Sequence, residues 1–153
     1  MSRFSPSSLD EATVSMLGHA GWQPGRQVDV EELAREFDAW GLPMHQYARS
    51  VLESLYGLTV EPVGPEGANF HVDKIRFDPD LAADREVVDE VSRQFAADMF
   101  PIACMYTDGI YVSPEGLTVC SLQDENWLVG RTFEEALDRL VCLTGEVEVF
   151  DRP

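Results

Sequence analysis

The spacing of apolar residues changes along this chain, and that change decides which folds the chain can form. Up to Leu55, apolar residues recur every three or four positions, which is the spacing of amphipathic helices. From Leu58 onward, most short apolar runs have the alternating pattern of strands. Because the two patterns do not alternate regularly with each other, the sequence predicts an α+β fold rather than a parallel α/β fold.

Three helices are expected in the first part of the chain. Ser8 and Glu11 form a capping-box pattern that predicts a helix over residues 8–20. Asp29 is expected to cap a second helix over 30–40, and Pro43 is expected to begin a third that ends before Gly57. Helical spacing predicts the buried face of each of the first two helices. In the first helix this face is Leu9, Ala12, Met16 and Ala20. In the second it is Val30, Leu33, Ala34, Phe37 and Trp40.

The rest of the chain is expected to form a mostly antiparallel sheet, one further helix and a closing C-terminal helix. The further helix is predicted over 84–98 by its apolar spacing. Thr132 and Glu135 form a second capping box at the start of the closing helix. The last apolar run, 146–150, is expected to add an edge strand. The other strands are expected at 58–63, 69–72, 74–77, 99–106, 109–112, 117–122 and 126–129.

Length and composition predict one domain over residues 1–153, since 153 residues with 44% apolar content can bury a core without a metal or disulfide bond. No apolar run approaches the ~20 residues that span a bilayer. The start of the chain also lacks the apolar core of a signal peptide, so a cytoplasmic location is expected. The three cysteines show neither CxxC nor CxxxH spacing, and buried free thiols are expected at Cys104, Cys120 and Cys142.

Acidic residues exceed basic residues throughout the chain. There are 28 acidic and 11 basic residues, and the formal net charge is −17. The counts are 9 against 4 in residues 1–62, 9 against 4 in 63–100 and 10 against 3 in 101–153. Direct binding to nucleic acid is therefore not expected, because phosphates require Lys and Arg. The charge favours encounter with a basic protein partner, and the alternative is that it only maintains solubility.

The sequence contains none of the common catalytic motifs: GxGxxG, the Walker lysine motif, HExxH and GxSxG do not occur. His19, His45 and His71 are scattered, with His45 expected in the first turn of the third helix. Lys74 precedes an apparent strand without a glycine-rich phosphate loop. No enzyme activity, cofactor or metal site is expected. A hydrolase with paired carboxylates stays an alternative, which would require two acidic groups in contrasting environments in a deep pocket.

Acidic residues in the expected loops of the β-rich half, together with one tryptophan, are the candidate contacts with a protein partner. Carboxylates attract a basic partner, and a large amphipathic ring is a common anchor of protein interfaces. For the acidic groups the alternative is solvated surface charge, and for the tryptophan it is packing beneath the closing helix. The candidates are Asp78, Asp80, Asp108, Asp124, Glu125 and Trp127.

Three segments, in this order and spacing, resemble those of one protein family. They are AGWQPGR at 20–26, MFPIA at 99–103 and WLVGRTFEEALDRL at 127–140. The chain is similar over nearly its full length to the third subgroup of the SUKH superfamily of immunity proteins. The resemblance implies an α+β fold without enzymatic activity. It also implies that the chain neutralises the nuclease or deaminase of a bacterial polymorphic toxin system by direct binding.

Two functional hypotheses from different classes follow. In the first, the chain is a cytoplasmic immunity protein that binds one cognate toxin with a basic surface and blocks its nucleic-acid site. In the second, it is a non-catalytic interaction scaffold or regulatory binding module with other protein partners. The neighbouring genes would distinguish them, because only the first requires a toxin. The sequence does not specify an oligomeric state.

Overall fold

The centre of the molecule is an antiparallel sheet in which each strand pairs with the next strand in the sequence. The structure is a computed structural model that describes residues 3–62 and 74–153. Within these residues the sheet has seven strands in the order β1-β2-β3-β4-β5-β6-β7. The strands are β1 (Thr59–Val60), β2 (Ile75–Arg76), β3 (Phe100–Met105), β4 (Asp108–Val112), β5 (Thr118–Ser121), β6 (Glu125–Gly130) and β7 (Glu148–Asp151).

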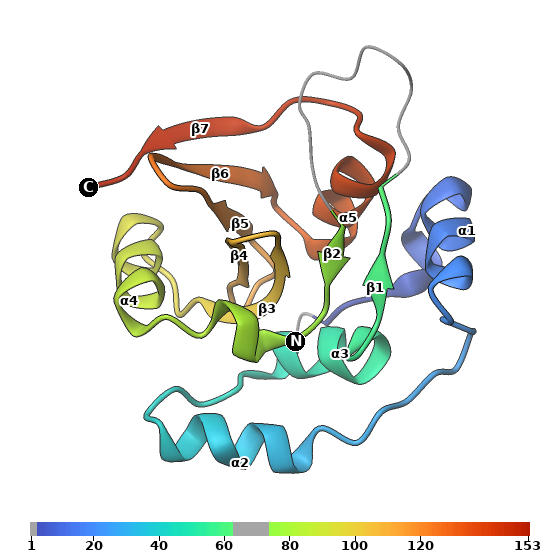
Figure 1. Ribbon diagram of the computed structural model, residues 1–153, viewed down its shortest axis with the longest axis horizontal. Coiled ribbons are helices and arrows are strands. Elements are labelled where there is room, and N and C mark those ends of the chain that lie inside the picture. The colour runs from blue at the N-terminus through green and yellow to red at the C-terminus, as the bar shows by residue number, and fades with distance from the viewer. Residues whose placement is uncertain (1–2, 63–73) are drawn as a thin grey trace.

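The helices cover both faces of this sheet. Figure 1 shows α4 on one side of the curved sheet and α1 and α5 toward the other. The 3-10 helix η2, Pro79–Ala82, links β2 to α4. The α-helices are α1 (Glu11–His19), α2 (Glu31–Ala39), α3 (Gln46–Leu55), α4 (Arg85–Gln94) and α5 (Phe133–Cys142). The predicted α+β architecture, with N-terminal helices and a closing helix, is therefore confirmed.

Alternation along the strands divides the core into two clusters. Ile110 and Val112 of β4 belong to the larger cluster, which also contains the buried faces of α1, α2, α3 and α5. Tyr111, between them, points to the opposite face and packs with Val88 and Val91 of α4. A strand covered on both faces must bury every residue, and four of the five residues of β4 are buried.

Most of the expected strands are present, and several are shorter than the sequence pattern predicts. The expected edge strand at 146–150 is confirmed as β7, which pairs with β6. Only Thr59–Val60 of the run at 58–63 is assigned to a strand. The expected strand at 69–72, which includes His71, lies outside the described residues.

Two helix starts differ from the sequence prediction. Ser8 belongs to a short 3-10 helix, Pro6–Ser8, and α1 begins at Glu11 after Asp10, so the capping box assigned to Ser8 is wrong. Proline near the start of this segment fixes the tight turn that replaces the first helical turn. α3 begins at Gln46 rather than Pro43, because the ring of His45 caps the helix by accepting a hydrogen bond from the Ala48 amide.

The cap predicted for α5 is present, and α4 has a cap that its apolar spacing did not predict. Thr132 Oγ1 accepts a hydrogen bond from the Glu135 amide at 3.1 Å and begins α5. Asp84 caps α4 by accepting hydrogen bonds from the amides of Glu86 and Val87. α4 ends at Gln94, earlier than predicted, because Ala96 has a φ of 51°. Asp29 accepts a bond from the Glu31 amide, although the residue at the cap position is Val30.

Two predicted buried faces need correction. In α1 the buried residues are Thr13 and Leu17 rather than Ala12 and Met16. Thr13 is satisfied there because its hydroxyl donates to the Asp138 carboxylate of α5 at 2.6 Å. In α2, Trp40 is 41% exposed, whereas the rest of the apolar stripe packs inward or is partly covered.

The remaining structural expectations concern cysteines and membranes. Cys104, Cys120 and Cys142 are buried free thiols, as predicted. Burial raises the pKa of both Cys104 and Cys120, so these thiols resist ionisation. Within the described part of the chain, no helix has the length and apolar character required to cross a membrane.

Candidate protein-binding surface

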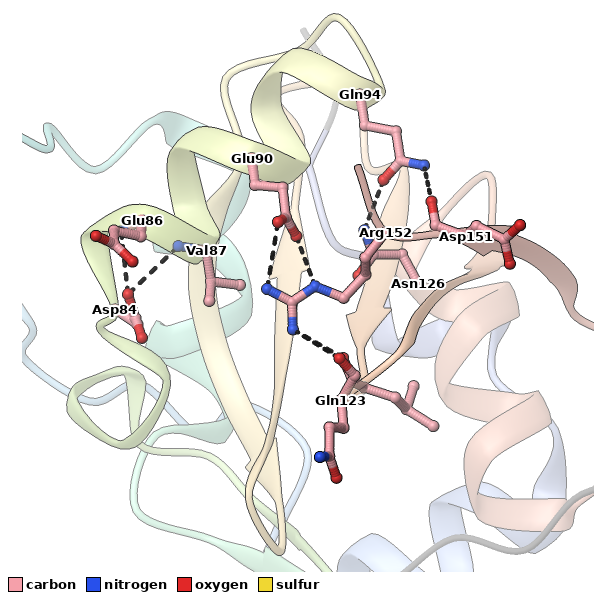
Figure 2. A network of polar contacts seen from close by, with 10 residues as sticks. Asp84, Glu86, Val87, Glu90, Gln94, Gln123, Asn126, Asp151 and Arg152 are labelled. Carbon is pink, nitrogen blue, oxygen red and sulfur yellow. Dashed lines mark hydrogen bonds and ion pairs between the residues drawn. The ribbon is translucent and has the colours of Figure 1, made fainter.

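The segment between β2 and α4 carries carboxylates at successive turns. Asp78 precedes η2, and its Oδ1 accepts a hydrogen bond from the Asp80 amide at 3.1 Å. Pro79, at the first position of η2, presets the backbone for this turn. Asp84 then caps α4 by accepting from the amides of Glu86 and Val87, as Figure 2 shows. The local sequence thus fixes two short turns that place Asp80 and Leu81 on the surface.

A pocket of about 410 Å³ lies between this segment and the sheet. Gly109, Tyr111 and Ser121 contribute to it from two adjacent strands, and Asp80 and Asp84 contribute from η2 and the start of α4. Tyr111 ties the two sides together because its hydroxyl donates to the backbone oxygen of Ala82 at 3.0 Å. Burial raises the pKa of Tyr111, which keeps this hydroxyl neutral.

The pocket is electrostatically negative. Among the residues that the structure describes, no ion pair engages Asp80, Asp84 or Asp108, all of which line the pocket. Burial raises the pKa of Asp80, and the neighbouring charge of Asp78 raises it further. Burial also raises the pKa of Asp108. A cation placed in the pocket would lower both pKa values, so these carboxylates would favour a cationic ligand.

One cation lines the pocket, and it already has partners. The Arg152 guanidinium forms two bonds with the Glu90 carboxylate, at 2.8 Å to Oε2 and 3.3 Å to Oε1. Its Nη1 also donates to the backbone oxygens of Leu122 and Gln123 (Figure 2). Glu90 therefore neutralises most of the Arg152 charge and leaves the three aspartates in excess.

Exposed apolar side chains adjoin these carboxylates. Trp40 lines a second hollow, of about 310 Å³, that shares Asp80 and Ala83 with the pocket. The Arg85 guanidinium lies 5.6 Å from the centre of the Trp40 ring, and its Nη1 donates to the Trp40 backbone oxygen. Leu81 is 43% exposed and lines the first pocket. Large exposed apolar groups surrounded by charge are typical of protein-binding surfaces.

Comparison with known proteins assigns the chain to a family. A family model described as SUKH-3 immunity protein matches residues 9–142. The chain belongs to the SUKH-3 immunity protein family. The family indicated by the three sequence motifs is thereby confirmed. Neither the comparison with curated proteins nor that with solved structures gives a match.

Three of the candidate contact residues in this SUKH-3 protein gather at the pocket. Asp80 and Asp108 line it, and Asp78 is bonded to the backbone of Asp80. They come from η2, its cap and the first residue of β4. The sheet brings Asp80 and Asp108 to one hollow although 28 positions separate them in the sequence.

The other three candidates lie on the β5–β6 hairpin. Asp124 is in the turn, next to Gln123, which lines the pocket. Glu125 lies within β6 rather than in the expected loop, and Trp127 lies in the same strand, within the run predicted at 126–129. Trp127 is partly buried against the larger cluster, which contains the core face of α5, and its Nε1 donates to Glu125 Oε1 at 2.9 Å. The hairpin thus extends the acidic surface, while the tryptophan ring contributes to packing.

Sequence reasoning missed four residues of this surface in the SUKH-3 chain. Trp40 was expected in the core because its spacing continues the apolar stripe of α2, but it stands at the helix end, where the stripe runs out. Leu81 directly follows the candidate Asp80, and Asp84, four positions after Asp80, is the cap of α4. Ser121 is the polar last residue of β5, a strand whose four residues are all buried.

The described histidines and the candidate metal ligands of this SUKH-3 protein can be considered in turn. Across residues 3–62 and 74–153, no group of three or more His, Cys, Asp or Glu side chains is placed to hold a metal ion. Both ring nitrogens of His45 contact the protein, at the Ala48 amide and the Val112 carbonyl. His19 is the last residue of α1, where a positive charge would complement the helix dipole.

Proposed function

We propose that this chain is an immunity protein of a bacterial polymorphic toxin system and binds one cognate toxin through the acidic pocket and its apolar rim. The proposal rests on family membership together with one observation: three pocket carboxylates that form no ion pair with the described residues lie beside exposed Trp40 and Leu81. Asp78, Asp124 and Glu125 extend the same charge along the surface. Neutralisation occurs by contact, without catalysis by this chain.

The proposed toxin is a nuclease or a deaminase that acts on nucleic acid. Such an enzyme needs a positively charged surface to hold phosphates. A protein with a net charge of −17 would be drawn to that surface and would compete with the nucleic acid for it. The long-range charge would accelerate encounter in the cytoplasm, while Trp40 and Leu81, once desolvated, would slow dissociation.

Co-expression with the toxin-like gene nearest to the chain in its host genome tests this proposal. Cells carrying the toxin should survive only with the immunity gene. The double variant Asp80→Asn/Asp108→Asn should reduce the association rate by roughly tenfold or more at low salt, because it removes two charges at the interface. The matched control, Glu11→Gln/Glu148→Gln, removes two exposed charges on α1 and β7 and should preserve that rate.

Two results would count against this proposal. If no neighbouring gene encodes a toxin and the protein rescues growth against no candidate, immunity is rejected and an interaction scaffold becomes the better hypothesis. If the control variant slows association as much as Asp80→Asn/Asp108→Asn does, the toxin binds by general charge and not at this pocket.

A further inference from the structure

The pocket contains a buried hydroxyl without a partner. Ser121 lines the pocket and is 6% exposed, and its Oγ is shielded from solvent with no hydrogen-bond partner in residues 3–62 and 74–153. A buried polar atom without a partner destabilises the folded state, so such atoms are rare and often mark a site where a ligand supplies the bond. This observation is independent of the surrounding carboxylates.

The neighbouring strand carries a second unpartnered oxygen. Asn126 faces Ser121 across the β5–β6 pair. Its Nδ2 donates to Gln94 of α4 at 2.6 Å, as Figure 2 shows, but its buried Oδ1 has no partner. Further along β5 and β6, the same face of the sheet is apolar, and Val119 and Leu128 pack there against α4. Asn126 is thus bonded to the last residue of α4, whereas Ser121 lines the pocket.

Apart from Arg152, which already donates to Glu90 and to two backbone oxygens, the carboxylates and the Ser121 hydroxyl of the pocket can accept hydrogen bonds from a ligand. Asp80, Asp84 and Asp108 present carboxylate oxygens, Ser121 adds an unpartnered hydroxyl oxygen, and the Tyr111 hydroxyl has already committed its proton to Ala82. Their spread suits a ligand with several donors better than a single ion, since these carboxylates do not form a metal-binding group. A guanidinium has five N–H donors in a rigid plane and meets this requirement.

We propose that the pocket receives an arginine side chain of the partner. The guanidinium would bond to the pocket aspartates and to Ser121, and Leu81 at the edge would cover the aliphatic stem. This inference rests on the proposed function, because the arginine belongs to the toxin. It adds that a single inserted side chain, rather than a diffuse basic face, anchors the complex.

The probe is capped arginine, N-acetyl-arginine amide, titrated into the full chain while backbone amide NMR shifts are followed. Saturable shifts are expected at Asp80, Gly109 and Ser121. N-acetyl-citrulline amide has nearly the same shape without the charge and should produce no saturable shift. N-acetyl-lysine amide should bind more weakly than arginine, since an ammonium cannot bridge several acceptors in one plane. Equal responses to arginine and citrulline, or to arginine and lysine, would reject the assignment.

Two variants and one control locate the probe. Asp108→Asn should weaken capped-arginine binding by roughly tenfold, and Ser121→Ala by about threefold. The larger effect is expected at Asp108 because its carboxylate is charged, whereas the Ser121 hydroxyl is neutral and contributes less binding free energy. Glu11→Gln should leave the affinity unchanged. Normal amide spectra for all three proteins would show that they fold. Wild-type affinity in both pocket variants, or shifts spread evenly over acidic residues, would mean that the probe does not occupy this pocket.

The arginine site and the immunity function can fail separately. If capped arginine binds the pocket but no toxin is neutralised, the proposed function is rejected and the cation site stands. If the chain protects against a toxin, and Asp108→Asn and Ser121→Ala protect equally well, the function stands and the arginine anchor is rejected.

Discussion

His45 joins α3 to the sheet through both ring nitrogens. Nδ1 accepts from the Ala48 amide at 3.2 Å, and Nε2 lies 3.0 Å from the Val112 carbonyl oxygen. A carbonyl only accepts, so Nε2 carries the proton and the bonded ring is neutral. Burial lowers the pKa of His45, although Val112, Asp98 and Glu115 partly oppose this effect. A second proton would occupy Nδ1 and remove the helix cap.

This arrangement predicts a stability loss in weak acid. The unfolded chain binds a proton at His45 below its ordinary pKa of 6.5, whereas the folded chain binds it only at lower pH. The stability that neutral His45 gives the folded state is therefore fully present above pH 6.5, and it is lost as the pH falls through the lower pKa of the folded state. Urea unfolding measures this effect when wild type is compared with His45→Asn. The asparagine keeps a capping oxygen but does not titrate. Wild type should lose more stability between about pH 7.5 and 5; equal losses would contradict the prediction.

At the scale of elements, side-chain contacts hold the C-terminal strand β7 against α4, in addition to the backbone hydrogen bonds between β7 and β6. Gln94 donates to the Asp151 backbone oxygen at 3.1 Å, and Arg152 binds Glu90 (Figure 2). Glu90 and Arg152 are 16% and 28% exposed, so this pair is better shielded from solvent than the helical pair Arg85–Asp89, at 45% and 52%. The hydrogen bond to Glu90 raises the pKa of Arg152.

A double-mutant cycle tests the strength of this attachment. Glu90→Gln and Arg152→Ala should couple by about 1 kcal/mol in urea unfolding, at the upper end for partly exposed pairs. Arg85→Ala and Asp89→Asn form the matched control, which should couple by about 0.3–0.5 kcal/mol, the usual value for an i, i+4 pair. Arg152→Ala should also accelerate amide exchange in β7. Coupling no larger than in the control would mean that β7 is held by its ladder alone.

Local patterns predicted the elements well, because each depends on nearby residues. Alternation located β4, β5 and β6, and the cap at Thr132 marked the start of α5. The errors in the predicted buried faces arose where contacts between residues distant in the sequence determine burial. Thr13 is buried in place of Ala12 because Asp138, 125 positions away, satisfies its hydroxyl. Trp40 stays at the surface, where Arg85 contacts it from another helix.

The candidate site was predicted only in part for the same reason. Acidic loops beside η2 and β4 could be recognised from the sequence, but their shared pocket depends on sheet register and on the Tyr111 bond to Ala82. The burial of Ser121 Oγ without a partner among the described residues depends on the folded arrangement of the strands. Neither feature has a local sequence signature, so residue type alone could not separate these aspartates from ordinary surface charge.

At the scale of the whole molecule, the two apolar clusters share one sheet. Every strand from β4 to β6 contributes to both clusters, so neither can open without exposing the other side of the same strands. We propose that residues 1–153 form one cooperative domain. Packing of the α4 layer and of the α5 layer would then be lost in a single step.

Hydrogen exchange and fluorescence test this cooperativity. Amides of Val91 in α4 and Leu137 in α5 should report the same free energy of opening, equal to that from tryptophan fluorescence in urea. Leu137→Ala should lower both values by about 2–5 kcal/mol, since it leaves a cavity in the larger cluster. If the substitution lowers protection at Leu137 but leaves Val91 unchanged, the clusters unfold independently and the single-domain proposal is wrong.

The strand order also has a consequence for synthesis on the ribosome. Because each strand pairs with the next one made, the sheet can extend as the chain emerges, and such near-sequence contacts favour fast folding. α1 is the exception, since Asp10 and Thr13 bond to Asp138 of α5. α1 must therefore wait for α5, and the nascent protein cannot complete this helical layer until α5 has been made.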